Sequence, residues 1–300
     1  MMDCQLSLLY SDLLTSHSPS VSMAMCGIVQ RKHRNLSTPG TEKMPQIKDK
    51  LAAGEVVRLF GVGQLASPKL IEMIGFNGGY DGLWIDQEHA GLGMRDIELC
   101  TLAANAHGLD HFVRLPATDY ASVMRVLEAG ANGCMFSMIR GVRDADQAIR
   151  WAKFPPRGER GLNGGNRDGR FGLEPLAEYV PRVNKATFMG IQIETPEALA
   201  EVRDIAALED VDCIFIGPAD LSMILGVTGE FEHPKCLETI DAVARYCKEL
   251  KKPWGIVARS ASHAAKMREM GCQLFVLGSD IGAINGGVKG VKATYSDLFA

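Results

Sequence analysis

Residues 187–222, TFMGIQIETPEALAEVRDIAALEDVDCIFIGPADLS, carry the pattern strand, helix, strand and turn. The run TFMGIQIE is apolar and rich in β-forming residues, and it ends in a carboxylate, Glu194. The next run, TPEALAEVRDIAAL, has Thr195 as a helix N-cap, Pro196 in the first turn and its apolar residues on one helical face. DCIFIG is a second buried strand, and Asp220 follows it. Parallel strands joined by a crossover helix bring Glu194 and Asp220 to the same edge of one sheet.

Strand and helix patterns alternate on both sides of this unit. Helical patterns, such as PKLIEMIGF after Ser67, separate strand-like runs at 57–62, 82–86, 111–115, 133–138, 187–194, 212–217, 254–258 and 273–278. Eight strands alternating with helices predict an α/β fold, a TIM-type (β/α)8 barrel that residues 44–300 form as a single domain. An open doubly wound sheet is less favoured, because GVGQLA at 61–66 is not the Gly-rich phosphate turn GxGxxG.

The composition argues against several classes of function. A formal net charge of −4, with RKHR at 31–34 as its one dense basic run, disfavours nucleic-acid binding. The eight cysteines are scattered without a CxxC motif, which predicts neither a zinc site nor a disulfide framework and fits a reducing cytoplasm. No apolar stretch approaches the ~20 residues that span a bilayer, and Asp3 stands where a signal peptide has basic residues. We therefore expect a cytoplasmic protein with neither nucleic-acid nor membrane partners.

Residues 1–43 show neither the strand period nor the helix period for any length, and Ser, Thr, Pro and His punctuate them. Segments of this kind support a core poorly. We expect a disordered N-terminal extension, with the barrel domain beginning at Met44.

The segment 155–186 is rich in Gly, Arg and Asn and is too long for a simple connection. Long loops on a barrel are more often functional lids than accidents, so we expect a functional role for it. LEPLAEYVPRVN, within this segment, predicts a helix before the next strand.

Polar side chains follow the predicted strands at the points where the strands end. Because the active sites of (β/α)8 barrels lie at the C-terminal ends of the strands, these side chains should converge. In chain order they are Asp86, His89, Arg114, Gln192, Glu194, Asp220, Ser279 and Asp280.

The carboxylates of Glu194 and Asp220 suit a hard divalent cation. Two monodentate carboxylates, together with water and substrate oxygens, are how Mg²⁺ or Mn²⁺ is usually held, whereas zinc favours His or Cys. Each residue also has a structural interpretation, since Glu194 can stabilise a helix dipole and Asp220 can cap a short helix. Their positions on adjacent parallel strands favour the metal.

Two further residues point to chemistry at this edge. A buried Arg114 without a partner is costly, so it meets either an anionic substrate or a carboxylate such as Glu194 or Asp86. His89, three residues after Asp86, has the position of a general base whose tautomer an aspartate fixes. The alternative for His89 is a surface loop residue without a role, and Gln87 and Glu88 are expected to be loop residues, with a subunit contact as the other option.

GPADLS offers an anion site. Gly217 lets the backbone approach a ligand closely, and the free amides of Ala219 and Asp220 open a helix after Pro218. A small carboxylate is therefore expected to bind at residues 217–220.

The motifs WIDQEH, FVRLP, GIQIET, IFIGPADLS and FVLGSD, in this order from Gly61 to Asp280, resemble those of the pyruvate-dependent class II aldolases of the HpcH/HpaI family. The resemblance implies a barrel enzyme that typically assembles as a hexamer. It also implies that the enzyme cleaves 4-hydroxy-2-oxo acids to pyruvate and an aldehyde. For this reaction it would use a divalent metal, Mg²⁺ or Mn²⁺ with Co²⁺ as a further candidate.

The family's pattern assigns a role to each matching position. Glu194 and Asp220 would bind the metal, and Arg114 would stabilise the pyruvate enolate. His89, paired with Asp86, would act as the acid and base through a water on the metal. The substrate would meet Gln192, Gly217, Pro218, Ala219 and Asp220. The chain departs from the pattern at Ser137, where the family tends to have proline, and in the loop after PPRGERG, which we expect to face the aldehyde.

Other functions remain open from the sequence. Oxaloacetate decarboxylation, or capture of its enolate by another electrophile, would use the same metal site. A citrate-lyase-like or malyl-CoA-lyase-like enzyme is less favoured, because no basic motif for a CoA phosphate is visible around 55–66. A catalytically silent barrel that serves as a binding protein would have lost a metal ligand or the base, and all four polar positions are present.

Overall fold

The computed structural model describes residues 47–299. The expected extension over residues 1–43 and its boundary at Met44 lie outside the described residues.

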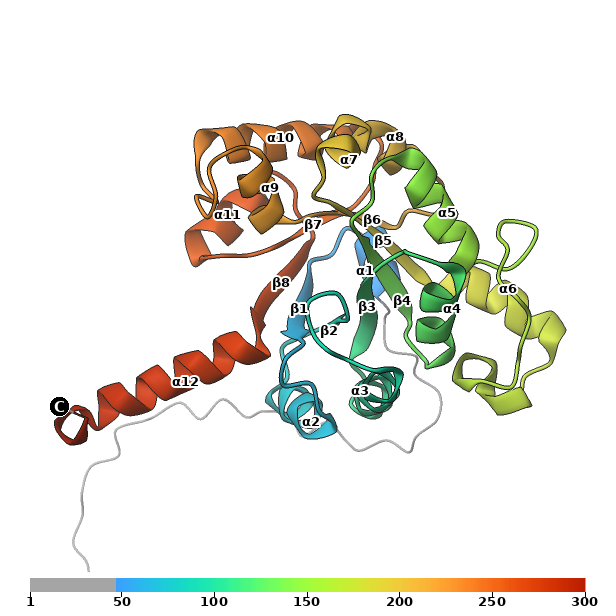
Figure 1. Ribbon diagram of the computed structural model, residues 1–300, viewed down its shortest axis with the longest axis horizontal. Coiled ribbons are helices and arrows are strands. Elements are labelled where there is room, and N and C mark those ends of the chain that lie inside the picture. Colours follow the sequence, from blue (N-terminus) through green and yellow to red (C-terminus); the bar gives the residue numbers. More distant parts are fainter. Residues whose placement is uncertain (1–46, 300) are drawn as a thin grey trace, which may run out of the picture. The chain divides into compact units, whose positions relative to one another are not determined.

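Eight parallel strands close into a barrel in the order of the sequence, with β1 hydrogen-bonded to β8 (Figure 1). All eight strands predicted from the sequence are present, within about one residue at each end. They are β1 (Val57–Val62), β2 (Gly82–Asp86), β3 (Asp110–Pro116), β4 (Gly133–Ser137), β5 (Phe188–Ile193), β6 (Cys213–Ile216), β7 (Trp254–Val257) and β8 (Leu274–Ser279). The predicted TIM-type barrel is confirmed.

Helices alternate with the strands and cover the outside of the barrel (Figure 1). The helix predicted over 195–208 is divided in two at Glu201, whose φ and ψ of −104° and 14° lie outside the helical range. The helices are α1 (Ile47–Ala52), α2 (Pro68–Asn77), α3 (Met94–Ala106), α4 (Tyr120–Glu128), α5 (Val142–Ala152), α6 (Leu176–Ala186), α7 (Pro196–Ala200), α8 (Val202–Ala207), α9 (Pro218–Ile224), α10 (Pro234–Glu249), α11 (Ala261–Glu269) and α12 (Asp280–Thr294), with 3₁₀ turns η1 (Arg167–Gly172) and η2 (Ser296–Leu298).

Two apolar layers make up the core. Alternate strand residues point inward and fill the barrel with large side chains, among them Trp84, Phe112 and Phe215. The ring of Trp84 lies 5.2 Å from that of Phe112 and 4.7 Å from that of Phe215. Ile47 and Leu51 of α1 join this inner cluster at the N-terminal end of the strands. The barrel is therefore packed inside, and its polar site can open only at the other end.

Hydroxyl N-caps fix where helices begin. Ser67 accepts the N–H of Leu70 at 3.2 Å, and Thr195 accepts the N–H of Ala198 at 3.1 Å, as predicted from the sequence. Thr195 also donates its hydroxyl to the carbonyl of Ile139 at 2.7 Å. The cap next to Glu194 is thus tied to the loop after β4, which holds that end of the barrel together.

Asp81, at the N-terminal end of β2, forms ion pairs with two basic side chains. Its carboxylate accepts hydrogen bonds from Lys50 at 2.6 Å and from the Arg58 guanidinium at 2.9 and 3.1 Å. Burial pushes the pKa of Asp81 up, but these hydrogen bonds lower it to about 2. The carboxylate therefore stabilises the fold above its unfolded pKa, near 4, and that stability is lost as the pH falls toward 2.

Asp81→Asn is expected to cost about 2 kcal/mol at neutral pH, which follows from the size of the pKa shift and corresponds to a Tm lower by about 4–8 °C. Urea unfolding of both proteins between pH 7 and 3 would measure the difference, which should shrink as the pH falls below about 4. Asp204→Asn, at an exposed position of α8, is the control. A difference that stays constant with pH would exclude the ionic explanation.

All six cysteines within residues 47–299 are buried and unpaired. Among the same residues, no helix is long and apolar enough to cross a membrane.

The segment 155–186 lies away from the end of the barrel where the predicted site residues gather. It runs from α5 back to the start of β5, and its η1 turn packs beside α4. The N–H of Gly161 donates to the Tyr120 hydroxyl at 2.7 Å, and Arg167 lies across Gly130, just before β4. The helix expected within the segment is α6, and the expectation that this loop faces the aldehyde stays a prediction. A connection from helix to strand belongs to the N-terminal end of a (β/α)8 barrel.

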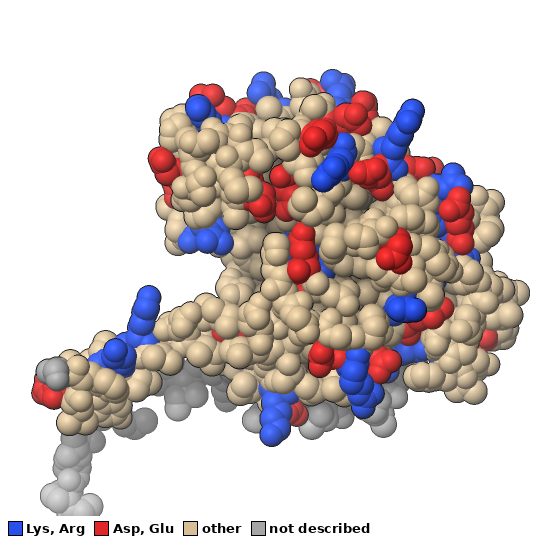
Figure 2. All heavy atoms as spheres, in the orientation of Figure 1, with Lys and Arg blue, Asp and Glu red and all other residues tan. Residues whose placement is uncertain are grey.

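Helix α12 projects away from the barrel and was not expected from the sequence (Figure 1). Its glycines give it a weak helical signal. Apolar side chains recur along one face of α12 at intervals of three and four residues, and they are between 39% and 54% exposed: Ile281, Ile284, Val288 and Val291. Tyr295 and Leu298, just beyond the helix, are exposed as well. Figure 2 shows this arm as largely uncharged, with Lys side chains standing out from it. Such a stripe is typical of a helix that packs against another surface.

Candidate active site

Glu194 follows β5 directly, and its carboxylate is buried at the C-terminal end of the barrel, with 5% of the residue exposed. One carboxylate oxygen accepts the N–H of Met138 at 2.8 Å, and the other accepts the side-chain amide of Gln192. Burial raises the pKa of Glu194, the Met138 N–H lowers it, and the nearby charges of Glu88 and Asp220 raise it further. A carboxylate among other carboxylates in a buried site is stabilised by a bound cation.

The N–H that reaches Glu194 comes from a strained backbone. Met138 has a φ of 56°, in the left-handed region that residues other than glycine rarely adopt. Strain of this kind costs about 1–3 kcal/mol and concentrates at functional sites. The neighbouring Ser137, the departure from the family pattern, is buried and its hydroxyl has no hydrogen-bond partner within the described structure.

Gly217 sits tightly against Glu194 and Gln192. A Cβ atom on Gly217 would lie 2.9 Å from a carboxylate oxygen of Glu194 and 3.0 Å from the amide nitrogen of Gln192. Gln192 is also buried, and its amide oxygen has no partner among the described residues. The glycine therefore lets the end of β6 approach these two side chains.

Residues 217–220 begin α9 as the sequence predicted. Gly217 is the N-cap residue, Pro218 is the first helical residue, and Asp220 lies in the first turn. The amides of Ala219 and Asp220 have no intrahelical acceptors, as at the start of any helix. Asp220 is half-buried, and its charge raises the pKa of Glu194. That Glu194 and Asp220 share one cation stays a prediction.

Arg114, at the end of β3, is held by two carboxylates. Its Nε donates to one oxygen of Asp86 at 2.9 Å, its Nη2 donates to the other, and its Nη1 lies 3.1 Å from Glu88. The guanidinium also lies 5.2 Å from the centre of the Trp84 ring. A planar fork bound on one edge by Asp86 and stacked on an aromatic ring is rigidly oriented.

His89 lies further out than the sequence suggested. Its side chain is 67% exposed, and its Nε2 is 3.8 Å from the Glu88 carboxylate. The Asp86 carboxylate accepts the backbone N–H of His89 at 3.3 Å and binds Arg114, and no contact joins it to the His89 ring. The two residues are close, but the expected pairing of the Asp86 carboxylate with the imidazole is absent from this structure.

Glu88 lies in the loop after β2, as expected, but its side chain reaches the site, which the sequence did not indicate. Its carboxylate is buried between Arg114 and the site, and its charge raises the pKa of Glu194. One of its oxygens has no hydrogen bond of good geometry among the described residues. An available signal was the spacing, because residues i and i+2 of an extended chain share a face, and Glu88 follows Asp86 by two.

Ser279 and Asp280, which also follow a strand, have structural roles. Ser279 caps α12 by accepting the N–H of Gly282 at 3.2 Å. The Asp280 carboxylate accepts the N–H groups of Gly63 at 2.9 Å and Leu65 at 2.7 Å. Asp280 therefore fixes the loop after β1.

The donor set at this end of the barrel fits a hard divalent cation. Within residues 47–299, no group of three or more His, Cys, Asp and Glu side chains is arranged to hold a metal ion. The charge of Asp220 nevertheless acts on Glu194, and the amide oxygen of Gln192 has no hydrogen bond among the described residues. Oxygen donors with few protein ligands are typical of Mg²⁺ and Mn²⁺ sites that leave positions for water and substrate.

A cavity of about 380 Å³ opens beside the site. Asp86 and Arg114 line it from one side and Arg259, after β7, lines it from another. The Arg259 guanidinium lies 4.5 Å from the centre of the Phe231 ring, and no described carboxylate is within ion-pair distance of it. The cavity thus has room for a small organic molecule. The guanidinium of Arg259 at its edge has no ion-pair partner among the described residues.

The barrel region of this chain matches a known protein family. The family model described as HpcH/HpaI aldolase/citrate lyase matches residues 62–285. The chain belongs to the HpcH/HpaI family. The match spans β2 to β8 and the last residue of β1, and it includes every predicted site residue.

Curated relatives and solved structures agree with the family. The 5-keto-4-deoxy-D-glucarate aldolase of Shigella boydii is 29% identical over 85% of this chain and 99% of its own length. The enzyme of the same name from Salmonella arizonae is 30% identical over 81% of this chain and 94% of its own. The HpcH/HpaI aldolase from Desulfitobacterium hafniense is 32% identical, with a TM-score of 0.76 over 82% of this chain and 96% of that one. This HpcH/HpaI family member is an aldolase, and its small-molecule reaction fits the metal-dependent class II type.

Proposed function

We propose that the chain cleaves 4-hydroxy-2-oxo acids to pyruvate and an aldehyde, with a divalent metal held by Glu194 and Asp220. The observation that carries the proposal is the buried Glu194 carboxylate, whose pKa is raised by burial and by the charges of Glu88 and Asp220. Mg²⁺ and Mn²⁺ suit these donors best, with Co²⁺ as a further candidate. When bound, the metal supplies Lewis acidity toward the carboxylate and keto oxygens of the 2-oxo acid.

Each remaining residue has a part in the proposed reaction. Arg114, oriented by Asp86 and Glu88, donates to the keto oxygen and stabilises the negative charge that develops there as the C3–C4 bond breaks. Gln192 lines the pyruvate subsite, and the amides at residues 217–220 bind the pyruvate carboxylate. His89 takes the proton of the C4 hydroxyl at the open edge of the site, with Glu88 beside its ring.

Pyruvate enolisation tests the proposal before any aldehyde is known. The metal-loaded protein is incubated with pyruvate in D₂O, and exchange of the methyl protons is followed by NMR. Metal-dependent exchange supports the assignment. Its absence at every metal tried, in a folded protein, would refute it.

The same site would serve oxaloacetate decarboxylation or an enolate-capturing synthase. A solved citrate synthase is 25% identical to this chain, with a TM-score of 0.75 over 84% of it. Only product analysis separates these reactions, because the first step is shared. Cleavage is favoured here because the curated relatives are named as aldolases.

We also propose that the aldehyde fragment carries an acidic group. The relatives in Shigella and Salmonella are named for a sugar diacid, whose cleavage leaves one carboxylate on each half. The unpaired Arg259 lies across the cavity from Arg114 and is held over Phe231, where it can bind that second carboxylate.

Arg259→Ala is expected to lower kcat/KM for tartronate semialdehyde in the aldol direction by about 10–100-fold, the usual worth of a charge-assisted hydrogen bond. Glyceraldehyde, with a hydroxymethyl group in place of the carboxylate, should react equally well with both proteins. Arg268→Ala, at an exposed position of α11, is the control. Equal losses with both aldehydes would mean that Arg259 does not recognise the carboxylate of the aldehyde.

The apolar stripe of α12 supports a homo-oligomer in which α12 packs on a second copy. Met73 and Phe76 of α2 are 56% and 76% exposed and offer an apolar surface that α12 of another copy can cover. Burying the stripe would contribute roughly 1.5–3 kcal/mol for each large side chain. The resemblance suggests a hexamer, and a reducing cytoplasm remains the proposed compartment.

Ile284→Asp together with Val288→Asp is expected to reduce the assembly by at least one dimerisation step without unfolding the barrel, because both side chains are exposed in the single chain. Light scattering after gel filtration measures the change, and circular dichroism checks the fold. Lys289→Asp, on the same helix but outside the stripe, is the control. An unchanged mass would place the contact elsewhere.

A further inference from the structure

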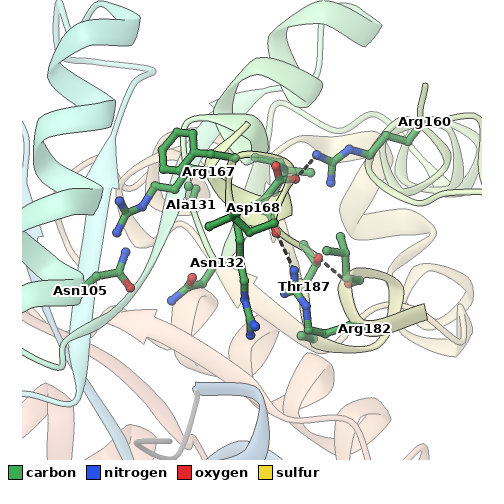
Figure 3. Close-up of a pocket in the computed structure, with 15 residues that line it drawn as sticks. Asn105, Ala131, Asn132, Arg160, Arg167, Asp168, Arg182 and Thr187 are labelled. Atoms are coloured by element: carbon green, nitrogen blue, oxygen red, sulfur yellow. Dashed lines mark hydrogen bonds and ion pairs between the residues drawn. The ribbon is translucent and has the colours of Figure 1, made fainter. Parts of the chain in front are cut away.

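A second cavity, of about 500 Å³, lies at the N-terminal ends of β4 and β5, away from the aldolase site (Figure 3). Its walls come from the ends of α3 and α4, the loop before β4, the η1 turn and α6. The residues that bear on its chemistry are Asn105, Asn132, Arg160, Arg167, Asp168, Arg170 and Arg182. Four guanidiniums, one carboxylate and two amides therefore face a space that can hold a small molecule.

Arg160 is the most deeply placed of these guanidiniums. It is 2% exposed, its Nη2 donates to Asp168, and the guanidinium lies 4.7 Å from the centre of the Phe154 ring. Its Nε and Nη1 have no acceptor among the described residues. A buried guanidinium with two unpaired N–H groups is costly, and an oxygen-rich ligand in the cavity would supply the missing acceptors.

The other arginines are only partly neutralised. Arg182 is paired with the Glu174 carboxylate, at 2.7 Å from its Nε, and the weaker contact of Arg170 to the same carboxylate is 3.9 Å. Arg167 has no carboxylate within ion-pair distance in the described chain. Figure 3 shows Arg167 pointing toward Asn105, while Arg160 reaches Asp168 from the other side. Asp168 and Glu174 each pair with one arginine, and the half-buried Glu128 of α4 also interacts with Arg160. The four arginines still outnumber these three carboxylates, so the cavity favours an anion.

The backbone conformation of η1 and of Gly130 places the arginine side chains around the cavity. Arg170 and Phe171 have φ values of 53° and 55°, a conformation that non-glycine residues adopt at a cost. Gly130 makes room for Arg167, since a Cβ there would lie 2.3 Å from the Arg167 Cδ. Asp168 keeps one carboxylate oxygen without a partner, which can accept a hydrogen bond from a ligand that also carries a hydroxyl.

We propose that this cavity binds a small oxyanion, a phosphate group, through Arg160, Arg167 and Arg170. Arginine forks match the oxygens of a phosphate, and the remaining P–OH of hydrogen phosphate donates to Asp168. The competing structural role for these arginines is to offset the partial negative charge, ~0.5 each, at the C-terminal ends of α3, α4 and α6.

Calorimetric titration of the metal-loaded protein with inorganic phosphate at constant ionic strength tests the site, and glycerol 3-phosphate in a parallel titration distinguishes a free phosphate from a phosphorylated metabolite. Arg167→Gln and Arg170→Gln should each weaken phosphate binding at least tenfold. Arg170 is exposed, so its variant guards against misfolding at Arg167. Arg125→Gln, on the outside of α4, should bind like the wild type.

Arg114→Lys separates this cavity from the aldolase site. Phosphate binding that survives Arg114→Lys and is lost in Arg167→Gln supports the proposal. Binding that is lost in Arg114→Lys instead would place phosphate at the aldolase site and overturn it. No binding in the wild type, with a lower Tm in Arg167→Gln, would assign the arginines to the helix ends alone.

Discussion

Glu194→Gln is expected to lower kcat/KM for 2-oxo acid cleavage by about 10³-fold, the value of roughly 4 kcal/mol of lost metal-assisted stabilisation. Glutamine keeps the size of the side chain and an oxygen that can accept the Met138 N–H, so the fold should survive. What is lost is the negative charge that holds the cation against the Asp220 carboxylate. Steady-state kinetics, with metal affinity measured by calorimetry, gives the result.

Two comparisons make this prediction specific. Asp220→Asn should reproduce the loss, because the metal needs both carboxylates. Glu197→Gln, three residues beyond Glu194 and exposed in the first turn of α7, should retain activity and metal affinity. If both site variants remain active in the presence of a chelator, the metal assignment is wrong and the carboxylates have another role.

Arg114→Lys is expected to reduce kcat by about 10²–10³-fold, the range found when one donor to a developing oxyanion is removed. Lysine keeps the charge but cannot bind both oxygens of Asp86, approach Glu88 and stack on Trp84 at once. Its ammonium would therefore no longer be oriented toward the keto oxygen. Kinetics with the cleavage substrate, and the rate of pyruvate methyl exchange, should fall together.

A stability measurement separates catalysis from structure for this residue. Removing the fork leaves Asp86 and Glu88 without their partner, so some loss of Tm is expected in Arg114→Lys. Arg125→Lys, at an exposed position of α4, controls for the general effect of the substitution. A lower Tm with unchanged kcat would show that Arg114 only supports the fold.

The strand pattern made most of the barrel predictable. Buried strand runs such as DCIFIG are continuous and apolar because both faces of a parallel sheet are covered, so they stand out from the helical periods between them. The pair Glu194 and Asp220 was predictable for the same reason, since the ends of parallel strands meet. The split of the helix at Glu201 was not predictable, because a local bend leaves the apolar spacing nearly unchanged.

The roles of loop residues were less predictable. Glu88 and His89 are neighbours in the sequence, yet one is buried against Arg114 and the other is exposed to solvent. Their orientation depends on how the chain leaves β2 and on Asp86, which binds the backbone N–H groups that follow it. Likewise, only the topology shows that the 155–186 connection returns to the N-terminal end of the barrel.

By itself, the sequence determined the order of eight strands, the barrel and the strand ends at which Arg114, Glu194 and Asp220 lie, because periodicity and parallel connectivity are local properties of the chain. The tertiary structure alone decided that Glu88 shares the site, that Asp86 binds Arg114 rather than the His89 ring, and that Arg160 is buried with unpaired donors. The physical reason is that burial and ion pairing depend on residues far apart in the sequence, which come together only when the barrel closes.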